Sequence, residues 1–183
     1  MKIIISILLI IVGLTSGKAQ SEWGIGYQLK SGFLLAHRGN MANLPQQTAW
    51  ASEFSFFRHL HQANSWVDFY KDPKVGMSFF IGSVGNNEVL GRYIATYGFA
   101  ELPIARLNKF ELSWKLGSGL GVTNRKYDSI FNPENIAIGS NLNMMIVMAL
   151  SAQYESQKSS ISLSADMTHF SNSAFKVPNL GLN

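Results

Sequence analysis

Residues 110–122 read Phe-Glu-Leu-Ser-Trp-Lys-Leu-Gly-Ser-Gly-Leu-Gly-Val, and this alternation decides the fold class. The even positions are apolar apart from Ser118, whereas the odd positions carry charged residues, a serine and then three glycines. Successive side chains of a β-strand point to opposite faces, so a period of two sustained over this length predicts a strand with one apolar face.

The same period recurs on both sides of this segment. Apolar residues fall mostly on odd positions in residues 23–35 and on even positions in the longer segment 136–154. We predict further strands at about 50–61, 74–84, 89–102 and 159–171, separated by turn signals rich in glycine, proline and asparagine. No segment after the N-terminus has the period of a helix. The sequence therefore predicts one all-β domain with seven recognisable strands.

The N-terminus has the layout of a cleaved secretory signal. A basic start precedes an almost uninterrupted apolar run over residues 3–14, and Gly17 and Ala19 provide small residues at the two positions that signal peptidase reads. The alternative is a membrane anchor, but a dozen apolar residues fall short of the roughly 20 that a spanning helix needs. We therefore expect residues 1–19 to be removed and residues 20–183 to form the mature domain.

Composition limits the classes of function. Without Lys2 and Lys18 the chain has 15 − 2 = 13 basic residues against 11 acidic ones, a net charge of +2 with the basic residues dispersed, so nucleic-acid binding gains little support. The absence of cysteine excludes disulfides and thiolate metal sites. His37, His59 and His61 have no second ligand at a convincing metal spacing. We expect neither a metal nor a cofactor.

Two all-β architectures fit the alternation. In a soluble sandwich one face of each strand is core and the other meets water. An antiparallel transmembrane β-barrel in the outer membrane is favoured by the signal segment and by strands that reach the 9–11 residues needed to cross a bilayer. Aromatic residues near strand ends, namely Trp23, Trp50, Trp66 and Tyr154, also favour it. Because bacterial barrels have an even number of strands, we predict about eight, with the last one lacking in a C-terminally truncated chain or one strand missed in the count.

The last predicted strand ends in a histidine and a serine on one face. His169 and Ser171 continue the apolar odd positions of residues 159–171, so in a barrel they face lipid. If the N-terminus starts in the periplasm, this end of the strand lies in the outer leaflet. Polar side chains facing lipid are unusual unless they act there. The alternative is an ordinary polar pair at the membrane interface.

The run over residues 168–183, Thr-His-Phe-Ser-Asn-Ser-Ala-Phe-Lys-Val-Pro-Asn-Leu-Gly-Leu-Asn, resembles the signature of the lipid A 3-O-deacylase (acyloxyacyl hydrolase) family of outer-membrane barrels. A His-x-Ser-Asn core is followed by Pro-Asn-x-Gly seven residues after the serine, and residues 119–143 also resemble the family. The resemblance implies a serine esterase that removes an ester-linked acyl chain from lipid A, or a related acylated lipid, in the outer leaflet.

The same resemblance implies the role of each site residue. Ser171 is the nucleophile and His169 the general base that takes its proton. Asn179 helps form the oxyanion hole, and Asn172 belongs to the motif as an oxyanion or substrate-positioning residue. Asn183 stands where the family has a glutamate that orients the histidine.

Asn183 is a departure from the family's pattern. An asparagine can accept the imidazole N–H but cannot stabilise the imidazolium as a carboxylate does, so a lower rate is expected. The alternative function is a non-catalytic structural or interaction barrel with a degenerate site.

Overall fold

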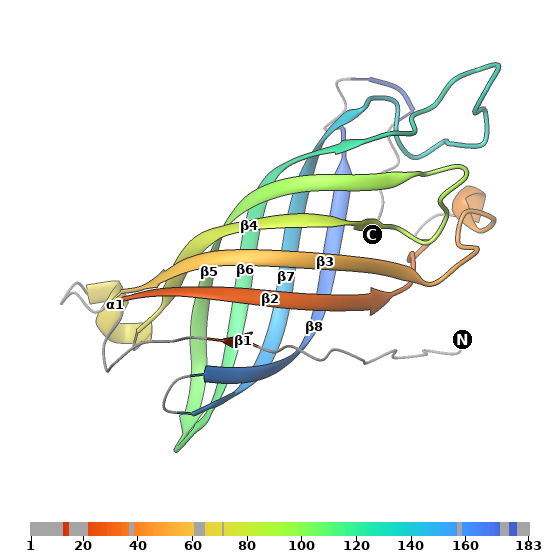
Figure 1. Ribbon diagram of the computed structural model, residues 1–183. Coiled ribbons are helices and arrows are strands. Elements are labelled where there is room, and N and C mark those ends of the chain that lie inside the picture. The colour runs from red at the N-terminus through yellow and green to blue at the C-terminus, as the bar shows by residue number, and fades with distance from the viewer. Residues whose placement is uncertain are drawn as a thin grey trace.

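The structure is a computed structural model that describes residues 13–14, 22–36, 39–60, 65–70, 72–156, 159–172 and 176–178. Seven long strands form a curved antiparallel sheet (Figure 1). Their bounds are β2 Trp23–Gly32, β3 Ala49–His59, β4 Lys74–Ser83, β5 Arg92–Leu107, β6 Phe110–Thr123, β7 Leu142–Glu155 and β8 Ser159–Ser171. Three short elements complete it: strand β1 (Gly13–Leu14), the 3-10 helix η1 (Gly39–Met41) and helix α1 (Ser65–Tyr70).

The sheet order is β1-β8-β7-β6-β5-β4-β3-β2, so each long strand pairs with its neighbour in the chain. This meander curls into an open barrel, and among the described residues no ladder joins β2 to β8. The prediction of an all-β antiparallel barrel with seven recognisable strands is confirmed. β1 lies within the segment expected to be a signal peptide and pairs Gly13 with Ser160 and Leu14 with Ser159.

Two local expectations were wrong. The period of two begins at residue 136, but strand β7 begins only at Leu142. The residues Ala137 and Ile138 are instead fully buried in the loop before the strand, where Asn135 Oδ1 accepts the Ile138 N–H at 3.2 Å. Helix α1 was not predicted, since six residues are too few to display a helical period. No helix in the described part of the chain is long and apolar enough to cross a membrane.

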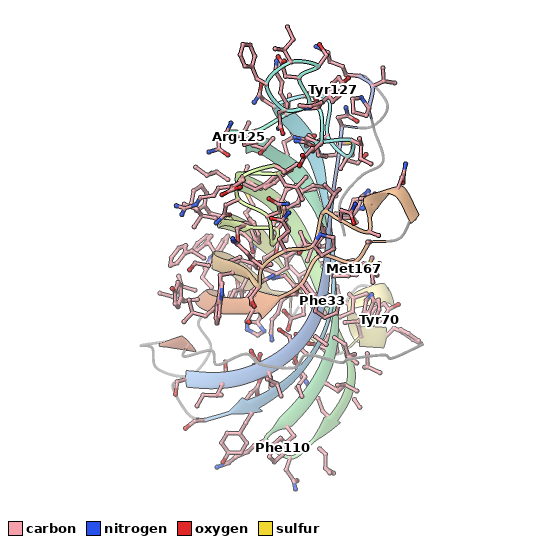
Figure 2. The ribbon with its side chains drawn as sticks, turned by 90° about the vertical axis from the view of Figure 1, so that its right-hand side faces the viewer. Phe33, Tyr70, Phe110, Arg125, Tyr127 and Met167 are labelled. Carbon is pink, nitrogen blue, oxygen red and sulfur yellow. The ribbon has the colours of Figure 1, made fainter. Side chains whose placement is uncertain are left out.

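Alternate side chains divide the sheet into an outward apolar face and an inward polar one. On β3 and β5, for example, Phe54 and Ile94 are 50% and 45% exposed, whereas Glu53 and Tyr93 are 1% and 0% exposed. The outward side chains form a broad apolar band suited to lipid. In Figure 2, Arg125 and Tyr127 lie at one end of the barrel and Phe110 lies at the other.

The lumen is filled by paired charges. The Glu53 carboxylate lies 2.7 Å from Lys30 Nζ and 2.8 Å from Lys115 Nζ, and it also accepts the Tyr97 hydroxyl. Lys30 Nζ lies 2.8 Å from Asp166. This ion pair connects β2 to β8, the first and last long strands, between which no ladder forms among the described residues. Buried charges are tolerated when they are paired in this way. The predicted polar faces therefore serve as the barrel's interior.

Candidate active site

The structure places His169 and Ser171 on the outward face near the end of β8. His169 pairs with Ile146 of β7 and Ser171 with Met144, and these two partners are 42% and 41% exposed on the apolar band. Residues that face each other across an antiparallel pair share a face of the sheet. The histidine and serine are therefore half-buried neighbours on the surface that meets lipid.

Between them, Phe170 points into the lumen. Its side chain is 1% exposed, and its ring centroid lies 4.3 Å from that of Tyr93 and 5.8 Å from that of Phe80. Gly121 provides space for this ring, because a Cβ there would lie 3.0 Å from Phe170 Cε1. The strand that carries the two outward polar residues is thus anchored from inside by an aromatic cluster.

Three glycines of β6, at positions 117, 119 and 121, lie where a larger side chain would be crowded. A Cβ at Gly117 would lie 2.6 Å from the Tyr97 ring, and Gly119 and Gly121 are similarly crowded by β5. These three positions therefore let β6 pack closely against the side chains of β5.

Asn172 follows β8 directly and holds the chain that comes after it. Its side chain is 2% exposed, and Nδ2 donates to the Lys176 carbonyl oxygen at 2.7 Å and to that of Pro178 at 3.4 Å. Gly139 admits the same segment, since a Cβ there would lie 2.8 Å from the Val177 carbonyl oxygen. Residues 176–178 are therefore fixed between the end of β8 and the loop before β7.

The remaining candidates are placed unevenly. Asn179 and Asn183 lie outside the described residues, as do His37 and His61. His59 pairs with Lys74 at the opposite end of the sheet from Ser171. Within the described ranges no group of three histidine or acidic side chains could hold a metal ion. The sequence alone did not single out Phe170 or Gly139. Phe170 could have been noticed, because it is an aromatic residue at an even position of residues 159–171, where most other even positions carry serine.

The connections differ in length at the two ends of the sheet. At one end, two turns span only residues 108–109 and 156–158, although the third connection, 60–73, is longer and contains α1. At the other end lie the loops 33–48, 84–91 and 124–141 and the segment after Ser171. Outer-membrane barrels have short periplasmic turns and longer extracellular loops. His169 and Ser171 lie at the end with the longer loops.

Comparison with known proteins extends the resemblance found at the C-terminus. A model of the family described as lipid A 3-O-deacylase (PagL) matches residues 53–183, which run from within β3 to the last residue. Comparisons with curated proteins and with solved structures give no match. The match covers well over half of the chain and agrees with the barrel. The chain belongs to the lipid A 3-O-deacylase family, whose members are outer-membrane hydrolases that act on lipid A.

Proposed function

We propose that this protein is a serine esterase that hydrolyses an ester-linked acyl chain of lipid A in the outer leaflet. The observation that carries the proposal is the position of His169 and Ser171, which are two residues apart on the lipid-facing side of β8 at the end with the longer loops. An ester bond near the boundary between acyl chains and sugar would meet this pair without leaving the membrane.

The reaction would proceed through an acyl-enzyme. His169 takes the proton of the Ser171 hydroxyl while Oγ attacks the ester carbonyl carbon. The tetrahedral intermediate collapses, the protonated histidine donates its proton to the departing sugar oxygen, and the acyl group remains on Ser171. Water, activated by the same histidine, then releases the fatty acid and restores the serine.

The asparagines would support this chemistry in different ways. Nδ2 of Asn172 is engaged by two backbone carbonyls, so we assign Asn172 a positioning role for the segment after the strand. Asn179 follows Pro178, one residue beyond this contact, and is proposed to stabilise the oxyanion. Asn183 is proposed to accept the ring N–H of His169 and so fix the tautomer of the imidazole. The hydrolysis rate is then expected to be lower than with a carboxylate at this position.

We also propose that residues 1–19 are a signal peptide. Cleavage there would remove β1 and expose that edge of β8. N-terminal sequencing of the protein recovered from outer membranes tests this proposal: a mature chain that begins at residue 20 would support it, and one that retains Met1 would contradict it.

The function is tested by mass spectrometry of lipid A after expression in an outer membrane. We expect lipid A to lose one acyl chain with the parent protein and to stay intact with Ser171→Ala and with His169→Asn. Ser162→Ala is the matched control, because Ser162 lies on the same strand but on the opposite, inward face, and it should keep the activity. Heat-dependent gel migration verifies that each variant folds.

Two results would overturn the proposal. Intact lipid A with the folded parent protein would indicate a non-catalytic barrel. Acyl loss that persists in folded Ser171→Ala would place the nucleophile elsewhere.

A further inference from the structure

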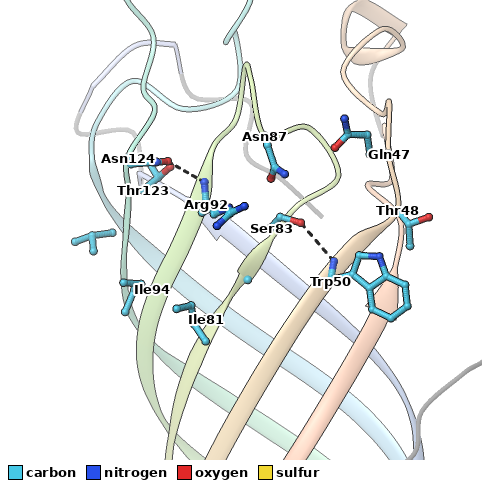
Figure 3. A pocket seen from close by; sticks show the side chains of 12 residues that line it. Gln47, Thr48, Trp50, Ile81, Ser83, Asn87, Arg92, Ile94, Thr123 and Asn124 are labelled. Carbon is cyan, nitrogen blue, oxygen red and sulfur yellow. Dashed lines mark hydrogen bonds between the residues drawn. The ribbon is translucent and has the colours of Figure 1, made fainter.

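A groove of about 820 Å³ lies on the outward face over β3 to β6, apart from His169 and Ser171 (Figure 3). Its lower wall is a row of branched apolar side chains that pair across three strands, with Ile81 opposite Ile94 and Ile94 opposite Val122. The volume lies within the range of small-molecule sites. The wall is apolar and faces lipid, so it suits an acyl chain.

The upper rim of the groove is polar. Ser83 pairs with Arg92, and the Arg92 backbone N–H donates to Asn124 Oδ1 at 2.8 Å. In Figure 3 the Arg92 side chain lies between Asn124 and Ser83, above Ile81 and Ile94. This rim continues the apolar wall toward the loop end of the barrel, where lipid headgroups lie.

The rim is rich in donors and carries a positive charge. Among the residues that line the groove, all of them in the described part of the chain, Arg92 is the only charged one. Asn124 Oδ1 is occupied by a backbone N–H, which leaves its amide nitrogen as a donor. The Ser83 oxygen accepts the Trp50 N–H at 3.4 Å, so its hydroxyl proton can also be donated. A guanidinium beside such donors fits a phosphate group.

The groove lies close enough to the candidate active site to contact the same lipid. Ser171 pairs with Met144, which pairs with Leu120, two residues before Val122 on β6. Val122 is thus two strand spacings across and two residues along from Ser171. These steps are about 10 Å and about 7 Å, which places the two residues about 12 Å apart on the outward face.

We propose that this groove binds lipid A, with a phosphate group at Arg92 and an acyl chain against Ile81, Ile94 and Val122. The inference rests on the proposed function for the identity of the lipid. Lipid A is a phosphorylated, multiply acylated disaccharide, so one molecule can place a phosphate at the rim and an ester at Ser171. The groove then positions the substrate but takes no part in bond breaking.

Binding is measured separately from catalysis by using the Ser171→Ala protein in detergent and counting bound lipid by native mass spectrometry. Arg92→Gln in this background should weaken lipid A binding by about tenfold or more, the effect of losing hydrogen bonds to a charged group. Arg92→Lys should keep part of the affinity. Arg125→Gln, the matched control, removes an exposed arginine at the same end of the barrel and should bind as the parent does.

A second experiment varies the lipid instead of the protein. Dephosphorylated lipid A should bind the Arg92→Gln and parent proteins equally, and phosphatidylglycerol should bind more weakly than lipid A. The proposal is overturned if Arg92→Gln and Arg125→Gln bind lipid A alike, or if phosphatidylglycerol binds as tightly with the same dependence on Arg92. Neither result depends on acyl release, so failure of the proposed function would be recognised on its own.

Discussion

Replacing Phe170 tests whether the lumen holds in place the strand that carries the proposed catalytic pair. The side chain is 1% exposed and its ring packs on those of Tyr93 and Phe80. Truncation of a buried phenylalanine to alanine costs about 3–5 kcal/mol, of which the lost ring pairs supply about 1 kcal/mol. Domains are stable by about 5–15 kcal/mol, so Phe170→Ala should fold with a much reduced margin. Phe170→Leu keeps most of the apolar volume and should cost about 2 kcal/mol.

Urea unfolding in lipid vesicles, followed by tryptophan fluorescence, measures these costs. Phe79→Ala is the matched control, because Phe79 precedes Phe80 on β4 but faces outward and is 49% exposed. Lipid can occupy the space that the outward ring leaves, so we expect a cost of about 1 kcal/mol there. The difference between the two alanine variants isolates the contribution of the inward cluster.

The activity of Phe170→Leu completes the test. A small shift of β8 would move His169 and Ser171 relative to the ester, and a misplacement of about 1 Å can lower a rate by about 100-fold. We expect kcat of the folded variant to fall at least about tenfold with KM little changed, because substrate contacts on the outward face remain. The reasoning is refuted if Phe170→Ala costs no more than Phe79→Ala, or if Phe170→Leu keeps the parent's kcat.

Three further changes probe contacts elsewhere in the barrel, two by the same unfolding assay and one by proteolysis. Gly121→Val adds bulk where a Cβ would lie only 3.0 Å from Phe170, so it should cost about 1–3 kcal/mol; an unchanged midpoint would contradict the crowding. Lys30→Met removes the cation that lies 2.8 Å from Asp166 and should lower the free energy of unfolding by about 3–5 kcal/mol. Adding Asp166→Asn to this variant should restore part of that stability. If the losses of the two single variants simply add in the double variant, the pairing is contradicted. Two backbone N–H groups hold the pKa of Asp128 below its ordinary value, so its turn should be intact at neutral pH and lost as pH falls through that lowered pKa. Asp128→Ala should speed proteolysis of its loop without changing the global midpoint.

Much of the fold could be predicted because the alternation of apolar and polar residues and the positions of the turn residues indicate the same strands. The predicted strand 159–171 has the bounds of β8, since its alternation runs unbroken from one turn to the motif. The start of β7 could not be predicted, because Ala137 and Ile138 continue the alternation while packing inside a loop. Periodicity reports which residues are apolar but not what they pack against.

The candidate site, too, could be predicted only where its features belong to a single strand. Parity predicted that His169 and Ser171 face outward together, since that property is local to one strand. The cluster around Phe170 could not be predicted, because Tyr93 and Phe80 come from other strands. The groove at Arg92 was missed for the same reason. A sequence in which basic residues are dispersed does not reveal that one of them lies above an apolar wall assembled from three strands.

The alternation of β8 separates stability from chemistry within a single strand. Inward residues such as Phe170 and Asp166 connect it to the aromatic cluster and to Lys30, whereas His169 and Ser171 contribute their side chains to the lipid face. Because the two sets share a backbone but not an environment, a substitution on the outward face should change mainly the chemistry, whereas one on the inward face should also disturb the backbone that carries the outward residues. Ser171→Ala should therefore abolish acyl release with little effect on unfolding, while Phe170→Ala should lower both. A strand built in this way can change its outward residues, the proposed catalytic pair among them, without rebuilding the barrel that positions them.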